Sequence, residues 1–308
     1  MAAPTGLAAG GTNAVGRMLG LLGDEWNLLI IQQAVMGATR YGHFLSRLPI
    51  SNAVLSNRLR MLTDESLLVR TDGGYLPTER SRSLWPLLML IWEWERTWVP
   101  DRADRLPAMG HSDCGQLFSP VLRCSACHAE ACIDTVDLTL GPSGGWERSA
   151  PAAATRRRSD SREAARRAGL FPETMTVLGN RWAAALLCAA FLGATRFGEF
   201  QALLGAPPSL LSERLQTFCE IGVLRVQSAG GDRGDYQLTD KGRAFFGILV
   251  TALQWAQRWF RAPEGPAVVT VHRGCGSRFI AELACNRCHD RLTGAGVTVS
   301  AAEGSGSP

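Results

Sequence analysis

The stretch GATRYGHF at residues 37–44 returns as GATRFGEF at residues 193–200, with six identical residues in eight. The same spacing of 156 residues aligns Trp26 with Trp182. Self-similarity at a fixed spacing indicates that one structural unit occurs twice in the chain. Beyond residue 73 the spacing becomes 161, so the second copy carries five extra residues between two presumed strands.

The repeat continues into a constellation of cysteines and histidines. His111, Cys114, Cys124, Cys127 and His128 recur as His272, Cys275, Cys285, Cys288 and His289. The duplicated unit is therefore one domain followed by a small Cys/His extension. The glycine-, proline- and alanine-rich stretch between the copies predicts a flexible linker, and its run Arg156–Arg158 reads as a solvated surface rather than a phosphate site.

These observations predict six segments. They are a first domain (13–105), its extension (106–132), a linker (133–160), a second domain (161–265), its extension (266–293) and a disordered tail (294–308).

Apolar periodicity predicts the elements of one copy. Helices are expected at residues 14–22, 25–36, 41–48 and 51–65, a hairpin at 67–76, and a long helix at 78–98. Helices followed by a small hairpin describe a winged helix-turn-helix. The predicted fold class is mainly α with small β-hairpins (α+β): two such domains in tandem, each with a small zinc-ribbon-like β extension.

The helix expected at 51–65 is the candidate recognition helix. Leu55, Leu59 and Leu62 share one face and predict core contacts, whereas the opposite face is small, polar or cationic. Asn and Arg donors reach base edges in the major groove, and a flanking Arg suits a phosphate. The candidate DNA contacts are Arg40, Asn52, Ala53, Ser56, Asn57, Arg58 and Arg60 in the first copy, and Arg196, Ser209, Ser212, Glu213, Arg214, Gln216 and Arg233 in the second.

Several motifs, in order, resemble the HxlR family of bacterial winged-helix regulators. The first copy has LSNRL at 55–59, and the second has LSERL at 211–215 and YQLTDKGR at 236–243. The resemblance covers about 85 residues of each copy and implies DNA binding as a dimer whose first and last helices form the interface. The cysteine that family members often carry before the first helix is replaced by Asn13 and Gly169, and the Cys/His extension is absent from the basic family plan.

The two copies differ on the candidate recognition surface. Glu213 replaces Asn57 and Gln216 replaces Arg60, and the longer second wing offers Arg233. We expect an intramolecular pseudo-dimer, with a tryptophan-rich seam between the long helices, that reads an imperfect palindrome. The alternative is a protein-interaction or metal- or redox-sensing module in which the second copy, or both, no longer reads DNA.

The Cys/His extensions leave three readings. C-x-x-C-H at 124–128 and 285–289 matches a c-type haem attachment signature, but haem leaves the first cysteine of each extension unexplained. Paired knuckles with tetrahedral Cys₃His ligation favour structural zinc, two ions per chain, and a metal- or redox-responsive site is the remaining alternative. Each extension is expected to form its own site, with His111, Cys114, Cys124 and Cys127 in the first and His272, Cys275, Cys285 and Cys288 in the second. His128 and His289 are the less favoured fourth ligands.

Composition sets the remaining expectations. The 308 residues carry a net charge of +4, which permits a polyanionic partner. The first residues lack a signal peptide, and the apolar segments are too short to span a bilayer, so the sequence predicts a cytoplasmic protein without a membrane partner. The expected partners are double-stranded DNA and a second copy of the chain. No catalytic set stands out, so no enzyme activity is predicted, and the sequence leaves the effector open.

Overall fold

The computed structural model describes residues 3–149, 171–227 and 234–300. The first copy contains α1 (Ala14–Leu21), α2 (Glu25–Val35), α3 (Tyr41–Arg47), α4 (Asn52–Asp64), β2 (Leu68–Thr71), β3 (Gly74–Pro77), α5 (Glu79–Arg82), α6 (Trp85–Trp98) and α7 (Pro100–Ala103). The second contains α10 (Pro172–Leu178), α11 (Arg181–Phe191), α12 (Phe197–Leu204), α13 (Pro208–Glu220), β8 (Leu224–Gln227), β9 (Asp235–Leu238), α14 (Asp240–Arg243) and α15 (Phe246–Trp259). Both copies therefore have the predicted winged helix-turn-helix order, and the mixed α/β fold class is confirmed.

Local signals explain where these elements begin and end. Ser51 caps α4, its hydroxyl accepting a hydrogen bond from the Val54 N–H. Gly37 follows α2 with a φ of 90°, a conformation that side chains disfavour, and Gly193 repeats this after α11 with a φ of 97°. The long helix predicted at 78–98 is divided into α5 and α6, and the second copy repeats this division between α14 and α15 although Gly247 stands in the place of Pro86.

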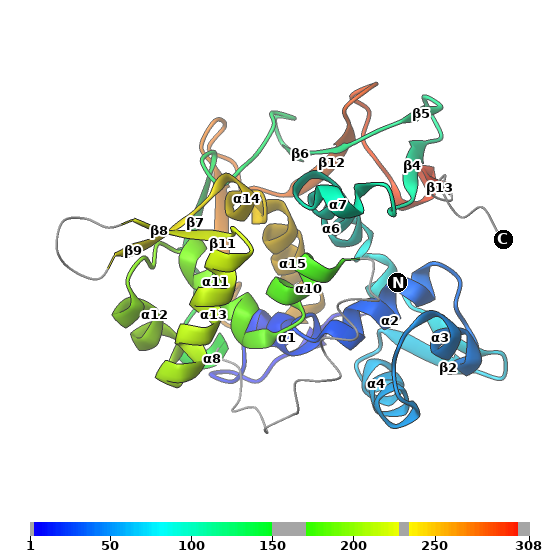
Figure 1. Cartoon of the computed structure of the whole chain (residues 1–308), viewed down its shortest axis with the longest axis horizontal. Coiled ribbons are helices and arrows are strands. Elements are labelled where there is room, and N and C mark those ends of the chain that lie inside the picture. Colours follow the sequence, from blue (N-terminus) through cyan, green and yellow to red (C-terminus); the bar gives the residue numbers. More distant parts are fainter. Residues whose placement is uncertain (1–2, 150–170, 228–233, 301–308) are drawn as a thin grey trace.

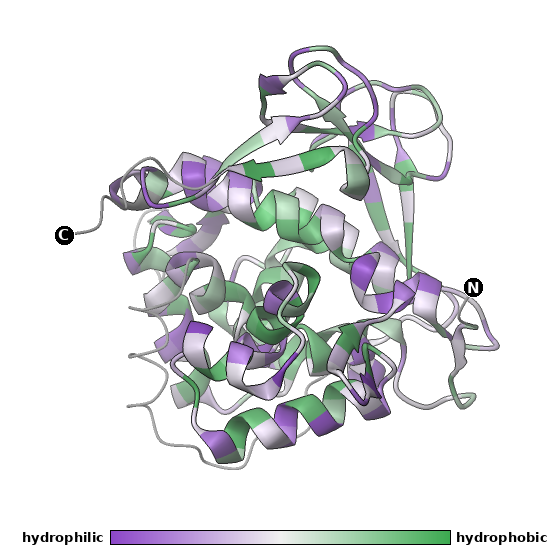
Figure 2. Cartoon of the chain, turned by 90° about the vertical axis from the view of Figure 1, so that its right-hand side faces the viewer, coloured by the Kyte–Doolittle hydropathy of each residue, from purple (hydrophilic) through white to green (hydrophobic). Residues whose placement is uncertain are grey.

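The core lies where the two copies meet. Helices α6 and α15 pack against each other, α1 packs on α15, and α10 packs on α6. The Trp94 Nε1 donates to the Lys241 carbonyl at 3.0 Å, and the equivalent Trp255 donates to the Arg80 carbonyl at 2.8 Å. Hydrophobic residues gather on the central helices, as Figure 2 shows. The two copies thus share one hydrophobic core and are not independent domains.

The strands of the extensions cross from one copy to the other (Figure 1). They are β4 (Ala108–His111), β5 (Gln116–Leu117), β6 (Pro120–Cys124), β7 (Val136–Leu140), β11 (Val268–His272), β12 (Ala281–Cys285) and β13 (Val297–Ser300). Strand β6 pairs antiparallel with β12, β7 with β11, and β13 with β4, which also pairs with β5. Apart from the β4–β5 hairpin, each of these ladders joins the two halves of the chain.

The register of these ladders defines a pseudo-two-fold axis. Leu122 lies opposite Leu283, its own equivalent in the second copy, so the axis passes through this pair. The pairing of His111 with Val297 is mirrored by that of His272 with Val136. Far from the extensions, Asp24 and Asn180 also form a bridge, and they are equivalent residues too.

Two predicted unstructured segments are folded where the structure describes them. The expected linker contains β7 and the short helix α8 (Trp146–Ser149) up to residue 149, and the expected tail contains β13 up to residue 300. Strands β7 and β13 are ordered because each forms a ladder with a strand of the other copy. The linker residues 150–160 and the tail residues 301–308 lie outside the described residues, as does the first part of the predicted second domain, 161–170.

Across the described ranges, every helix is too short or too polar to cross a membrane.

Candidate nucleic-acid interface and metal centres

Helix α4 separates a buried face from an exposed one as predicted. Leu55, Leu59 and Leu62 are fully buried and anchor the helix in the domain core. Of the candidate contacts, Arg40, Asn52, Ala53, Ser56, Asn57, Arg60, Arg196, Ser209, Ser212, Glu213 and Gln216 are exposed. Arg233 lies outside the described residues.

Arg58 and Arg214 differ from the other candidate contacts because both are half-buried. The Arg58 guanidinium donates to the Asp24 carboxylate at 2.6 Å, and its side chain is only 18% exposed. Arg214 is 12% exposed and lies 3.4 Å from Glu213. Their charges are already engaged by protein carboxylates, which makes them poor candidates for a phosphate contact.

Tyr41 is a residue that sequence reasoning missed. Its hydroxyl lies 3.0 Å from the Asn52 carbonyl oxygen and 3.1 Å from the Ser56 hydroxyl, and so ties α3 to the first turns of α4. The second copy has Phe197 at the equivalent position and lacks this tie. The sequence offered one sign of this contact, because the repeat has tyrosine at position 41 and phenylalanine at the equivalent position 197.

The two exposed surfaces differ in charge. The first copy presents Arg40, His43, Arg47 and Arg60 where the second has Arg196, Glu199, Leu203 and Gln216. Arg196 is paired with the Asp235 carboxylate at 3.3 Å. The backbone N–H groups of Thr195 and Arg196 hold the pKa of Glu199 below its usual value, so that carboxylate is negative at neutral pH. The first surface is cationic and the second is close to neutral.

The Cys/His residues form two tetrads, each drawn from both copies. The first tetrad is His111, Cys114, Cys285 and Cys288, and the second is Cys124, Cys127, His272 and Cys275. Within each tetrad the candidate ligand atoms lie within 4.8 Å of one another. The eight residues are those predicted, but the expectation of one site per extension is wrong.

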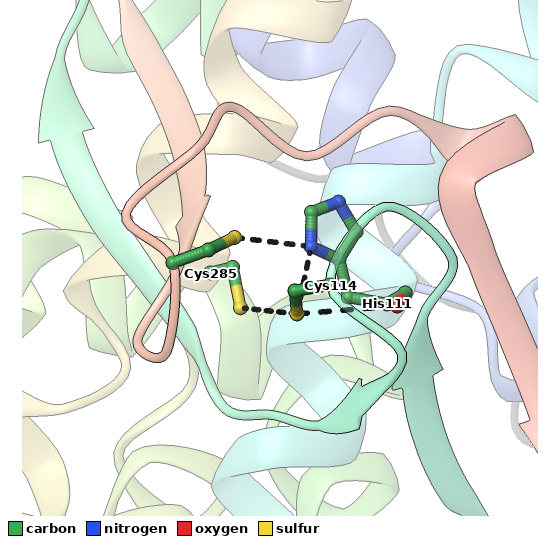
Figure 3. A group of neighbouring side chains, drawn as sticks. His111, Cys114 and Cys285 are labelled. Carbon is green, nitrogen blue, oxygen red and sulfur yellow. Dashed lines mark hydrogen bonds between the residues drawn. The ribbon is translucent and has the colours of Figure 1, made fainter.

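The crossing follows from the strand pairing. Strands β6 and β12 run antiparallel, and each delivers its C-x-x-C pair to the His-x-x-Cys pair of the other copy. A local hairpin would have kept Cys124 beside Cys114. Instead Cys114 lies 4.0 Å from Cys285, sulfur to sulfur (Figure 3).

The spacing within the tetrads suits a tetrahedral ion. Zn–S and Zn–N bonds of about 2.3 and 2.0 Å give tetrahedral edges of roughly 3.5 to 3.8 Å. The His111 Nδ1 lies 3.5 Å from the Cys114 Sγ and 3.3 Å from the Cys288 Sγ. In the second tetrad, the His272 Nδ1 lies 3.3 Å from the Cys127 Sγ and 3.4 Å from the Cys275 Sγ. One imidazole and three thiols at these distances form a donor set that fits zinc.

One thiol of the second tetrad, that of Cys275, has a lowered pKa. Hydrogen bonds to its sulfur lower the pKa of Cys275 to about 6; the bond from the Ser277 N–H has the largest effect, and the bond from the His272 ring comes next. The thiolate is the form that binds metals, and a thiol with this pKa is largely deprotonated at neutral pH.

The histidines that completed the haem signature lie outside both tetrads. His128 and His289 adopt positive φ angles of 58° and 63° in the turn after each C-x-x-C pair. The His128 Nδ1 lies 3.3 Å from the Glu282 carboxylate instead. The preference for His111 and His272 over these residues agrees with the geometry.

The fold and its exposed helices define a tandem winged helix-turn-helix protein. The HxlR-like helix-turn-helix family matches at residues 21–103 and 177–264, which is more than half of the chain. The chain therefore belongs to this family, as the sequence motifs predicted, and is a DNA-binding transcriptional regulator rather than an enzyme.

Two curated relatives each match a stretch about as long as a single copy. The uncharacterized HTH-type transcriptional regulator Rv3095 of Mycobacterium tuberculosis is 36% identical over 126 residues, covering 40% of this chain and 80% of its own. The uncharacterized HTH-type transcriptional regulator YvaP of Bacillus subtilis is 35% identical over 92 residues, covering 29% and 85%. The solved structure of PA1607 is 35% identical, covers 42% of this chain and 92% of its own, and has a TM-score of 0.38.

Proposed function

We propose that this regulator binds double-stranded DNA as an intramolecular pseudo-dimer, with α4 and α13 as its two recognition helices. The pseudo-two-fold register through Leu122 and Leu283 supports this proposal, because a dimeric reader places equivalent helices on two half-sites. The operator is then an imperfect palindrome.

The half-sites contribute unequally. Asn57 and Arg60 are exposed on α4 and suit base-edge hydrogen bonds, whereas Glu213 and Gln216 occupy their places on α13. The Gln216 side chain also donates to Glu220 at 2.8 Å. We infer that the first copy supplies most of the affinity, and that the exposed positions predicted from the sequence are its contacts.

The test is a matched pair of substitutions. Arg60→Ala is expected to weaken operator binding by about five- to 150-fold, the equivalent of ~1–3 kcal/mol for one specific contact. Gln216→Ala, at the equivalent position, is expected to change affinity by less than about threefold. Fluorescence anisotropy with promoter DNA at fixed salt measures both values. Equal losses would contradict the unequal half-sites, and no loss from either would contradict the proposed recognition surface.

The second candidate function is supported by the near-neutral surface of the second copy. In that reading the copy serves only assembly or contacts another protein. Hydroxyl-radical footprinting separates the two, since a pseudo-dimer protects two half-sites and a single reading head protects one.

We further propose that each tetrad holds one structural zinc ion. The ions would be held by one imidazole and three thiolates each, and would fasten the two extensions together. Metal analysis of the purified chain is expected to give about two zinc ions. A chain that is free of metal, with reactive thiols, would contradict this and favour the redox-responsive alternative.

A further inference from the structure

A cavity of about 550 Å³ opens at the junction of the two copies. Its walls come from the start of α6 in the first copy, from α15 and β10 (Phe260–Arg261) in the second, and from the loop between β11 and β12. A volume of this size is typical of small-molecule sites.

The cavity combines an apolar floor with a cationic rim. Trp255, Phe260 and Phe279 are buried beneath it. Arg258, Arg261 and Arg278 also line it, and no Asp or Glu is among its described lining residues. Arg258 pairs with Glu79 outside the lining at 3.3 Å, whereas Arg261 and Arg278 are exposed and make no ion pair within the part of the chain that the structure describes.

The cationic rim is a feature of the second copy alone. The residues equivalent to Arg258, Arg261 and Arg278 are Thr97, Pro100 and Leu117. The apolar floor is partly kept, since Phe118 corresponds to Phe279. The shared fold therefore does not require these arginines, and their convergence on one cavity calls for another role.

We propose that this cavity binds an organic anion: a carboxylate carried on an aromatic or aliphatic body. Guanidinium groups bind carboxylates through paired hydrogen bonds, and the apolar floor removes the body of such a ligand from water. The indole N–H of Trp255 is already donated to the Arg80 carbonyl, so the floor contributes apolar contact only. The arginines supply the recognition.

The site would couple to DNA binding through its position. This step rests on the proposed function, since both copies must take part in reading DNA. Ligand contacts with α6 of one copy and α15 of the other alter the packing that sets the distance between the two recognition helices.

Binding is tested on the full chain without DNA. 1-Naphthoate is titrated by isothermal calorimetry and compared with the neutral 1-naphthamide, which has the same shape. Naphthoate is expected to bind saturably, at least fivefold more tightly than the amide. The double substitution R261E/R278E is expected to weaken naphthoate at least tenfold, whereas Arg105→Glu, an exposed arginine away from the cavity, is expected to have no effect.

Three results would each overturn the proposed anion site. They are equal affinities for naphthoate and naphthamide, equal losses of naphthoate affinity in R261E/R278E and R105E, and no saturable binding of naphthoate. Melting temperatures show whether the variants are folded, and R261Q/R278Q serves as a milder second variant. Weaker operator binding by R261E/R278E with unchanged naphthoate binding would assign these arginines to DNA phosphates, and would also overturn it.

The regulatory step is tested separately. Saturating naphthoate is expected to change operator affinity at least threefold, and an unchanged affinity would overturn the coupling. Failure of ligand binding leaves the Arg60→Ala result standing, so the two proposals fail independently.

Discussion

At the scale of single residues, exposure on α4 decides which arginines can reach DNA. Helical periodicity correctly predicted Leu55, Leu59 and Leu62 as buried, because the period of the helix is a local property. It did not predict that Arg58 is held by Asp24, 34 residues earlier. Ion pairs between distant segments depend on how the elements pack, and sequence spacing carries no such information.

Substitutions of Arg40 and Arg58 are therefore expected to have opposite effects on the salt dependence of DNA binding and on stability. Arg40→Ala is expected to reduce the slope of log affinity against log salt by about 0.9, the value for one lost phosphate contact, because Arg40 is exposed and has no ion-pair partner in residues 3–149, 171–227 and 234–300. Arg58→Ala is expected to leave that slope unchanged and to lower the free energy of unfolding by about 1–3 kcal/mol, because the half-buried Asp24 loses its ion-pair partner. Salt titrations of operator binding and urea denaturation measure the two effects. A reduced slope for Arg58→Ala would return that residue to the DNA interface.

At the scale of elements, a buried carboxylate joins α6 of the first copy to α10 of the second. Glu95 is fully buried, and its oxygens accept hydrogen bonds from the Glu173 N–H at 3.1 Å and the Thr174 N–H at 3.0 Å. Anionic side chains are favourable at a helix N-terminus, but burial removes water from this one. Burial dominates and raises the pKa of Glu95 above its usual value, although the hydrogen bonds from Thr174 and Glu173 oppose the shift.

The raised pKa predicts a pH dependence of stability. Between the ordinary carboxyl pKa and the raised native value, the folded chain binds more protons than the unfolded chain, so stability falls as pH rises through that window. Glu95→Gln removes this contribution and is expected to flatten the profile in the weakly acidic range. Urea denaturation across a pH series gives the two curves, and Glu93→Gln on the same helix controls for loss of a carboxylate. Parallel wild-type and Glu95→Gln curves would show that Glu95 does not titrate in that window.

The strands of the extensions mark the limit of prediction at this scale. The elements of the winged domains were predictable because their partners lie nearby in sequence. Strands β7 and β13 were read as linker and tail, since each is short and pairs with a strand in the other copy. A short apolar run has no distinctive local pattern until its partner is known.

At the scale of the whole molecule, the duplication places in one chain two copies that pack around a shared core. The shared core and the crossed strands keep the copies together at any protein concentration, because the second copy is present at the high effective concentration of a linked partner. The same arrangement frees the copies to diverge, and they have done so at the recognition surface and at the arginine-rimmed cavity. Symmetry is kept in the core, where both copies need it, and lost at the surface.

The crossed tetrads give the sharpest prediction about this arrangement. Cys114→Ser with Cys285→Ser removes two ligands from one tetrad, leaves the other complete, and is expected to keep about one zinc ion per chain. Cys114→Ser with Cys124→Ser removes one ligand from each tetrad and is expected to leave close to none after exchange against a chelator. Separate sites within each extension require the opposite pattern, because Cys114 and Cys124 would then share one ion. Zinc content of the two double variants, measured side by side on folded protein, therefore distinguishes a metal clamp between the copies from two independent ribbons.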